Sequence, residues 1–259
     1  MMQQEIISTK GLAVGYANKI ILQDINLSVP QGSVLAVLGL NGSGKSTFLR
    51  SIAGLQKVKQ GEIFLDGKLV QQYSEFERAK QISLVLPGRG DMVQGMFVHE
   101  LFSATRAAFN SGFGKLSSVD IHIIEKIISD LKIERLVQKR LYQLSDGEAQ
   151  MVFIARALIQ DTPVILLDEP TSFLDVVHKV EIFSLLAGLK KAGKTVVFTS
   201  HEIDIALQVA DYCLMIGKDG KHVFGTQGEV VARGVVEELF QIEGVRFDRE
   251  RLRMEIDIR

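Results

Sequence analysis

The chain has 259 residues, of which 46% are hydrophobic and 24% are charged, and its formal net charge is −1. This is the composition of a globular protein with a substantial core. The balanced charge gives no basic footprint, so we expect no nucleic-acid partner. Cys213 is the only cysteine, which excludes an intramolecular disulfide.

Targeting and membrane segments are not predicted. The N-terminal stretch MMQQEIISTK lacks the apolar region of a secretory signal, and no run of about 18 apolar residues occurs. The five histidines are scattered and show no metal-ligand spacing with Cys213.

The first part of the chain is predicted to form strands around one glycine-rich turn. Alternating apolar residues indicate strands near 5–8, 12–15 and 20–28. The apolar run SVLAVLG (33–39) predicts a buried strand, followed by a glycine-rich turn and a short helix ending at Gly54. Further strands are predicted within GEIFLDGK (61–68) and QISLVL (81–86).

From about 97 to 160 the periodicity becomes helical, and this segment includes VHELFSATRAAF, SVDIHIIEKIISDL and LYQLSDGEAQMVFIARAL. In the last of these, Ser145 and Asp146 are typical capping residues. Met151, Ile154 and Leu158 then recur at steps of three and four residues. We therefore expect an amphipathic helix whose first turn lies at 145–148.

Strand signals return at PVILLD (163–168), KTVVFTS (194–200) and DYCLMIG (211–217), alternating with helices over roughly 176–192 and 202–210. This alternation predicts an α/β fold with a parallel sheet of βαβ units and a helical insertion, in one domain. An edge hairpin is expected at 217–225 and a helical segment near 235–243. The tail FDRERLRMEIDIR (247–259) shows no clear pattern.

The segment GLNGSGKS (39–46) matches the phosphate-binding pattern G-x-x-x-x-G-K-[ST] at every fixed position. Small residues let successive backbone N–H groups wrap a triphosphate, and the following helix adds its positive end. We expect Lys45 to reach the outer phosphates, Ser46 to ligate Mg²⁺ and Thr47 to contact phosphate. The residues expected to form the cradle itself are Gly39, Asn41, Gly42, Ser43 and Gly44.

Two carboxylates, Asp168 and Glu169, end the predicted strand VILLD. Strand C-termini of a parallel sheet line the ligand crevice, at the edge where the phosphate loop lies. Asp168 would hold Mg²⁺ and Glu169 would act as general base toward the attacking water. His201 follows another strand at that edge and would contact the terminal phosphate or orient the water. The alternatives are two solvated carboxylates and a histidine that merely caps a helix.

Together these motifs resemble an ABC-type ATPase, the nucleotide-binding subunit of an ATP-binding cassette transporter, over roughly residues 5–225. The ordered set comprises an aromatic residue at Tyr16, the Walker A loop at 39–46, a signature at 144–148, Walker B at 164–169, a D-loop SFLD at 172–175 and the switch histidine His201.

The resemblance implies a P-loop NTPase fold of the ABC type, with a mainly parallel sheet, an N-terminal antiparallel β subdomain and a helical insertion at about 97–160. It implies a single ABC ATPase domain over 1–259, with a C-terminal extension at about 226–259. ATP and Mg²⁺ are the implied cofactors.

By the same resemblance, two subunits pack head to tail, and Ser145 and Gly147 of one contact the terminal phosphate held by the other. Tyr16 would stack on adenine, or else be a half-buried strand aromatic, and Asp175 would communicate across the dimer interface.

Two departures from the family pattern stand out. The usual signature is Leu-Ser-Gly-Gly-Gln, whereas this chain has Asp146 and Glu148, whose negative charge would slow closure of the dimer. The family also places a glutamine after the strand that corresponds to QISLVL, where this chain has Pro87. Gln94 lies too far along the chain to replace it, so no Q-loop glutamine is assigned.

In its length, its LSDGEAQ variant and its C-terminal tail, the chain is most similar to ATPases that import iron complexes (siderophores, haem) or cobalamin into bacteria. Such a subunit would lie peripherally on the cytoplasmic face of the inner membrane, bound to polytopic permease subunits and served indirectly by a substrate-binding protein. A groove around 86–105, with Phe97, His99 and Phe102, would receive the permease. The alternatives are a soluble ABC ATPase of assembly or repair and a degenerate regulatory ATP-binding module.

Overall fold

The computed structural model describes residues 4–17, 19–87, 95–109, 115–172, 174–217, 219–240 and 245–256. Its central sheet has the order β10-β9-β3-β8-β7-β6, in which only β10 is antiparallel to its neighbour. The strands of this sheet are β3 (Val34–Gly39), β6 (Ile82–Val85), β7 (Val164–Leu167), β8 (Thr195–Ser200), β9 (Tyr212–Ile216) and β10 (His222–Thr226). The predicted parallel α/β core is confirmed.

A second, antiparallel sheet with the order β2-β1-β4-β5 comes from the N-terminal part of the chain. Its strands are β1 (Glu5–Tyr16), β2 (Lys19–Pro30), β4 (Gln60–Leu65) and β5 (Lys68–Leu69). The prediction of separate strands near 5–8 and 12–15 is wrong, because β1 runs through both. The pairing register with β2 shifts between Thr9 and Leu12, and Gly11 takes a φ of +52°, so a bulge interrupts the apolar alternation there.

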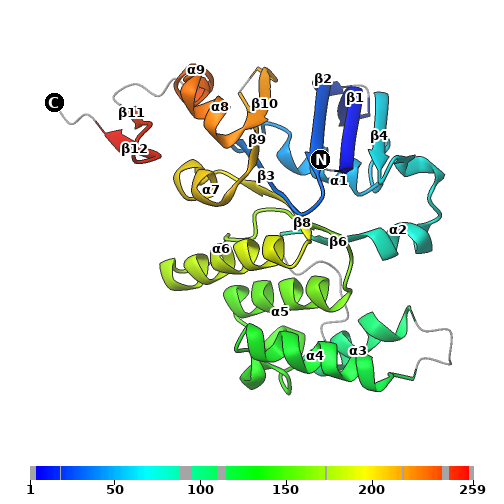
Figure 1. Cartoon of the computed structure of the whole chain (residues 1–259). Helices are drawn as coiled ribbons and strands as arrows, with labels where there is room; N and C mark the ends of the chain where they lie inside the picture. The colour runs from blue at the N-terminus through cyan, green and yellow to red at the C-terminus, as the bar shows by residue number, and fades with distance from the viewer. Residues whose placement is uncertain are drawn as a thin grey trace.

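The helices of the described residues are α1 (Lys45–Ile52), α2 (Glu75–Gln81), α3 (Val98–Ala107), α4 (Ser118–Asp130), α5 (Asp146–Ile159), α6 (Val176–Lys191), α7 (Ile203–Val209), α8 (Gln227–Ala232) and α9 (Val235–Phe240). In Figure 1, α3 and α4 lie at the end of the molecule farthest from β1 and β2, with α5 between them and the sheet. This is the predicted helical insertion. None of the described helices is long and apolar enough to cross a membrane.

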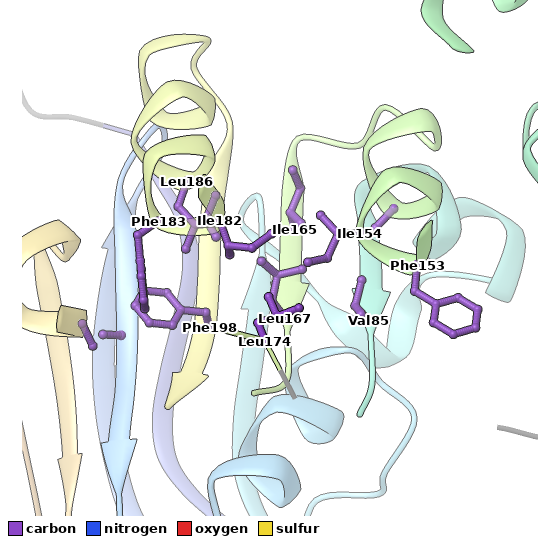
Figure 2. Packing of buried hydrophobic residues seen from close by; sticks show 14 of the residues in the cluster. Val85, Phe153, Ile154, Ile165, Leu167, Leu174, Ile182, Phe183, Leu186 and Phe198 are labelled. Atoms are coloured by element: carbon purple, nitrogen blue, oxygen red, sulfur yellow. The ribbon is translucent and has the colours of Figure 1, made fainter. Parts of the chain in front are cut away.

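Both faces of the central sheet are buried, which explains why its strands read as continuous apolar runs. In β3, Val34, Ala36 and Leu38 belong to one hydrophobic cluster, whereas Leu35 and Val37 belong to another. Figure 2 shows the first cluster, where Ile154 of α5, Phe183 of α6 and Phe198 of β8 gather around the strands. The second cluster packs α1 between the two sheets, with Phe48 fully buried.

The C-terminal tail, whose sequence shows no clear pattern, forms a hairpin of β11 (Val245–Asp248) and β12 (Arg253–Ile256). The hairpin docks near α7, because the N–H of Met254 donates to Oδ2 of Asp204 at 3.1 Å and Phe247 is buried. α2 and α8 were also missed, although capping boxes at Ser74 and Thr226 mark their starts.

Candidate functional site

The loop between β3 and α1 has a backbone that only glycine permits at its key positions. Gly42 and Gly44 have φ values of +80° and +106°. A Cβ on Gly44 would lie 2.7 Å from Cγ2 of Ile21, and one on Gly39 would lie 2.6 Å from Oγ of Ser43. The loop thus turns tightly from β3 into α1 and leaves a backbone cradle at the helix N-terminus, as predicted for 39–46.

Lys45 is held close to this loop. Its side chain is only 5% exposed, and Nζ donates to the carbonyl oxygens of Gly39 at 2.9 Å and Leu40 at 3.2 Å. The same ammonium lies 3.2 Å from Oε1 of Glu169. Lys45 therefore links the glycine-rich loop to the end of β7, where the two predicted carboxylates lie.

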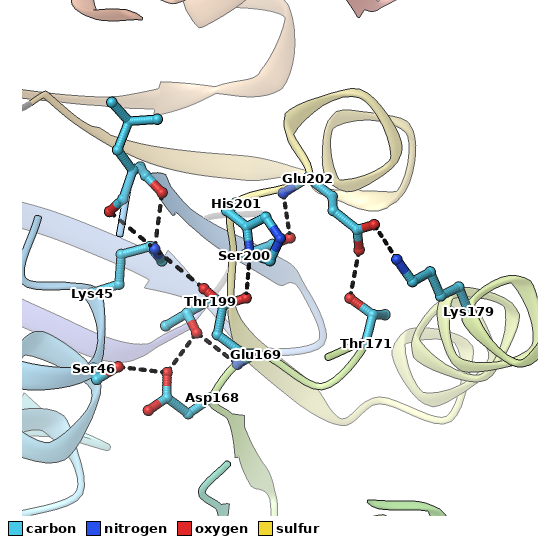
Figure 3. Close-up of polar contacts among 12 residues, drawn as sticks. Lys45, Ser46, Asp168, Glu169, Thr171, Lys179, Thr199, Ser200, His201 and Glu202 are labelled. Atoms are coloured by element: carbon cyan, nitrogen blue, oxygen red, sulfur yellow. Dashed lines mark hydrogen bonds and ion pairs between the residues drawn. The ribbon is translucent and has the colours of Figure 1, made fainter. Parts of the chain in front are cut away.

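Asp168 lies beneath the loop and is fully buried. Its Oδ1 accepts from Oγ of Ser46 at 2.9 Å and from Oγ1 of Thr199 at 2.6 Å (Figure 3). Its other oxygen, Oδ2, is buried without a hydrogen-bond partner among the described residues, as is Oγ of Ser43. Such orphaned buried oxygens are rare in folded proteins and fit the ligation of a cation and the binding of a phosphate group.

Glu169 is held in an uncommon conformation. Its φ is +50°, and its N–H donates to Oγ1 of Thr199 at 2.8 Å. Its Oε2 lies 2.7 Å from Nδ1 of His201 (Figure 3). The carboxylate therefore lies between Lys45 and His201, close to the glycine-rich loop.

Most of the predicted site residues line one cavity of about 410 Å³. Those that line it are Tyr16, Asn41, Gly42, Gly44, Lys45, Ser46, Thr47, Glu169 and His201. Tyr16 is 48% exposed, and its hydroxyl accepts from Oγ1 of Thr47 at 2.9 Å. Pro87, two residues after the end of β6, lines the same cavity. Gln94 lies outside the described residues.

Ser145, Gly147 and Asp175 do not join this cavity. They line a second one, of about 670 Å³, between the start of α5 and the start of α6. Ser145 caps α5, and Asp175 caps α6 by accepting from the N–H of His178 at 2.9 Å, which lowers the pKa of Asp175. Phe173, within the predicted D-loop, lies outside the described residues. The candidate residues thus divide into two groups on one chain.

Sequence reasoning missed Thr199, whose hydroxyl donates to the carboxylate of Asp168 and accepts from the backbone N–H of Glu169. Its signal was a hydroxyl two residues before His201, on a buried strand that also carries Thr195 and Ser200. It also missed Glu202, which accepts from Oγ1 of Thr171 at 2.7 Å and from Nζ of Lys179. Burial favours a higher pKa for Glu202, but these hydrogen bonds outweigh it and lower the pKa. In Figure 3 this contact joins the segment after His201 to α6.

Carboxylate and histidine clusters suited to a stand-alone metal site do not occur among the residues that the structure describes. One carboxylate, Asp168, and one hydroxyl, Ser46, fit instead the sparse protein ligation of Mg²⁺ bound together with phosphates.

Comparison with known proteins agrees with this arrangement. The family model for the ABC transporter matches residues 22–172. The iron(3+)-hydroxamate import ATP-binding protein FhuC of Bacillus subtilis (strain 168) is 34% identical over 238 residues, covering 92% of this chain and 88% of that protein. The petrobactin import ATP-binding protein FpuC of Bacillus anthracis is 34% identical over 239 residues, again covering 92% and 88%.

Among solved structures, the chain is similar to the dimeric ATP-binding cassette MJ0796 in a post-hydrolysis state bound to ADP and Pi. The TM-score is 0.75 at 26% sequence identity, and the match covers 86% of this chain and 99% of that one.

Proposed function

The chain belongs to the ABC transporter family and is the ATP-hydrolysing subunit of a transporter, and from this premise we propose that it powers bacterial import of an iron–siderophore complex. The cargo is supported by relatives named for import of iron(3+)-hydroxamate and petrobactin. Haem and cobalamin, also expected from the sequence, have no such support in these names. We treat residues 1–259 as one ABC ATPase domain, with a helical part at about 97–160 and a C-terminal extension at about 226–259.

The observation that carries the ATPase chemistry is the meeting of Lys45, Glu169 and His201 at one cavity. In the proposed mechanism, the N–H groups of the glycine-rich loop and the Lys45 ammonium bind the outer phosphates of ATP. The exposed Tyr16, which lines the same cavity, stacks its ring on adenine.

Ser46 and Asp168 would hold Mg²⁺, which when bound neutralises phosphate charge. Glu169 takes the proton of the attacking water as general base, and His201 holds the Glu169 carboxylate in place through its 2.7 Å contact. Thr199 fixes the backbone from which Glu169 projects.

Within one copy, Ser145 and Gly147 line a different cavity from the glycine-rich loop. We therefore place them on the nucleotide of a second copy, in a head-to-tail dimer with Asp175 at the interface. The dimeric cassette of similar fold supports this arrangement. We further propose that the dimer binds polytopic permease subunits, to which a substrate-binding protein delivers the cargo. The dimer would lie peripherally on the cytoplasmic face of the membrane.

Uptake of radiolabelled ferric siderophore tests the proposal. Cells that lack the gene would be complemented with the wild-type chain or with Glu169→Gln, and the tagged chain would be purified from gently solubilised membranes. Restored uptake by the wild type alone, with co-purifying polytopic subunits, would support import. Normal uptake in the deletion strain, with only soluble partners recovered, would favour an ABC ATPase of assembly or repair.

A further inference from the structure

The first turn of α5 carries a carboxylate, Glu148, where the family signature has glutamine. Oε2 of Glu148 accepts from the N–H of Ser145 at 3.0 Å, and the N–H of Glu148 donates to Oγ of Ser145 at 3.2 Å. This is a capping box, and it fixes the rotamer of Ser145. The box uses a lone pair of the Ser145 hydroxyl and leaves its proton to be donated to a phosphate oxygen.

The second carboxylate oxygen, Oε1, faces two cations. Nζ of Lys139 lies 3.0 Å from it and Nη1 of Arg135 lies 3.3 Å from it. The Glu148 side chain is 16% exposed and that of Lys139 is 37% exposed, whereas Arg135 is largely exposed. The hydrogen bond from the Ser145 N–H, together with Lys139 and Arg135, lowers the pKa of Glu148, so the group is ionised at neutral pH.

Lys139 is the better placed of the two cations. Its backbone carbonyl accepts from the N–H of Val98 at 3.0 Å, which anchors it to the first residue of α3. A lysine that starts from a fixed backbone and is partly buried loses less freedom on pairing than an exposed arginine. Its ion pair with Glu148 is also less screened by salt.

An unpaired carboxylate at this position would repel a nucleotide. Glu148 lines the same cavity as Ser145 and Gly147, and Asp146 adds a further carboxylate to its wall. Carboxylates at a helix N-terminus interact with its positive end, as phosphate does, and their negative charge opposes the approach of a phosphate. The charge of Glu148 must therefore be compensated if the start of α5 is to meet the terminal phosphate of ATP.

We propose that Lys139 is a positioning residue of the ATPase reaction, which neutralises Glu148 and so lets Ser145 and Gly147 engage the nucleotide of a second copy. This inference rests on the proposed head-to-tail dimer. It also accounts for the altered signature: the acid at 148 and the lysine at 139 replace the neutral glutamine as a matched pair. The negative charge expected to slow closure is thus offset at Glu148.

The test measures ATP-driven dimerisation of the full chain by sedimentation, in a Glu169→Gln background that blocks hydrolysis. Lys139→Met should raise the ATP concentration needed for half-maximal dimer by roughly fivefold, the upper range for a partly exposed ion pair. Adding Glu148→Gln to Lys139→Met should restore it to within about twofold, because the uncompensated charge is gone. Glu148→Gln alone should lower the requirement, since the charges of Lys139 and Arg135 are then no longer offset by a carboxylate beside the nucleotide.

A matched control is Lys221→Met, which removes an exposed lysine paired with Asp219 at 3.2 Å on the β9–β10 hairpin. It should leave the ATP requirement unchanged. Lys139→Arg keeps the charge and should behave as the parent, and Lys139→Gln, which also removes the charge, takes the place of Lys139→Met if that variant does not fold. The effect of Lys139→Met should shrink at high salt.

An unaltered ATP requirement in Lys139→Met, or a double variant no better than Lys139→Met, would overturn the inference while leaving the proposed function intact. Failure of the Glu169→Gln parent to dimerise with ATP would instead overturn the proposed dimer, and the inference with it.

Discussion

Nδ1 of His201 lies 2.7 Å from Oε2 of Glu169, at the carboxyl ends of the neighbouring parallel strands β8 and β7. The other oxygen of Glu169 faces the Lys45 ammonium at 3.2 Å. A carboxylate fixed from both sides keeps one orientation, which is what a general base toward a positioned water needs.

Glu169→Gln should therefore abolish steady ATP turnover, with kcat falling by roughly 10² to 10³, while ATP binding is retained. Glutamine keeps the shape and can still contact His201, but it cannot accept a proton. Phosphate release and nucleotide binding would be measured on the same preparation. Glu62→Gln, an identical change at an exposed position on β4, is the control and should not alter kcat. Turnover at the wild-type rate would remove Glu169 from the base role.

Lys45→Ala should weaken ATP binding by about tenfold or more, because the loop loses the cation that meets the outer phosphates. The carbonyls of Gly39 and Leu40 would also lose their donor, so the loop itself would loosen. Isothermal titration with ATP checks the affinity. An affinity equal to that of the wild type would contradict the assignment of the phosphate cradle.

Thr199→Val should reduce kcat by about tenfold and leave the KM for ATP nearly unchanged. The fully buried Thr199 hydroxyl accepts from the N–H of Glu169 and donates to Asp168, and valine does neither. The unsatisfied N–H should also lower the free energy of unfolding by about 1–3 kcal/mol.

Thr195→Val, on the same strand, separates the two effects. Thr195 is also fully buried, and its hydroxyl accepts from the N–H of Gly32 at 2.9 Å, away from both carboxylates. Urea unfolding should show a similar loss in the free energy of unfolding for this variant, whereas its kcat should stay at the wild-type value. Equal losses of kcat in both variants would show that Thr199 acts through stability alone.

The residues that meet at the candidate site could be proposed from the sequence because their motifs are local. The glycine-rich turn, its lysine and the strand-end carboxylates each occupy a short segment with a steric or chemical requirement of its own. Thr199 and Glu202 were not predicted, because their roles depend on contacts between distant segments. Thr199 acts through the pairing of β7 with β8, and Glu202 through its contacts with Thr171 and with Lys179 of α6. The bulge at Gly11 and the C-terminal hairpin were not predicted for the same reason, since their partners lie on other elements.

The contact of Glu202 with Thr171 and Lys179 makes stability depend on pH in a defined direction. Because the folded-state pKa of Glu202 lies below the ordinary value of 4.5, this carboxylate stabilises the fold above about pH 4.5. The stabilisation is lost as pH falls through the lower, folded-state pKa. Glu202→Gln should thus lower the free energy of unfolding by about 1 kcal/mol at pH 7, and the difference from the wild type should vanish in acid.

Lys179→Met should show the same pH profile, because it removes the cation that lowers the pKa of Glu202. Urea unfolding from pH 3 to pH 7 would measure both variants, and the double variant should lose less than the sum of the single losses. A pH-independent loss in Glu202→Gln would mean that its contribution is packing and not charge. Strictly additive losses would mean that Glu202 and Lys179 do not act as a pair, and the link between α6 and the segment after His201 would then rest on Thr171.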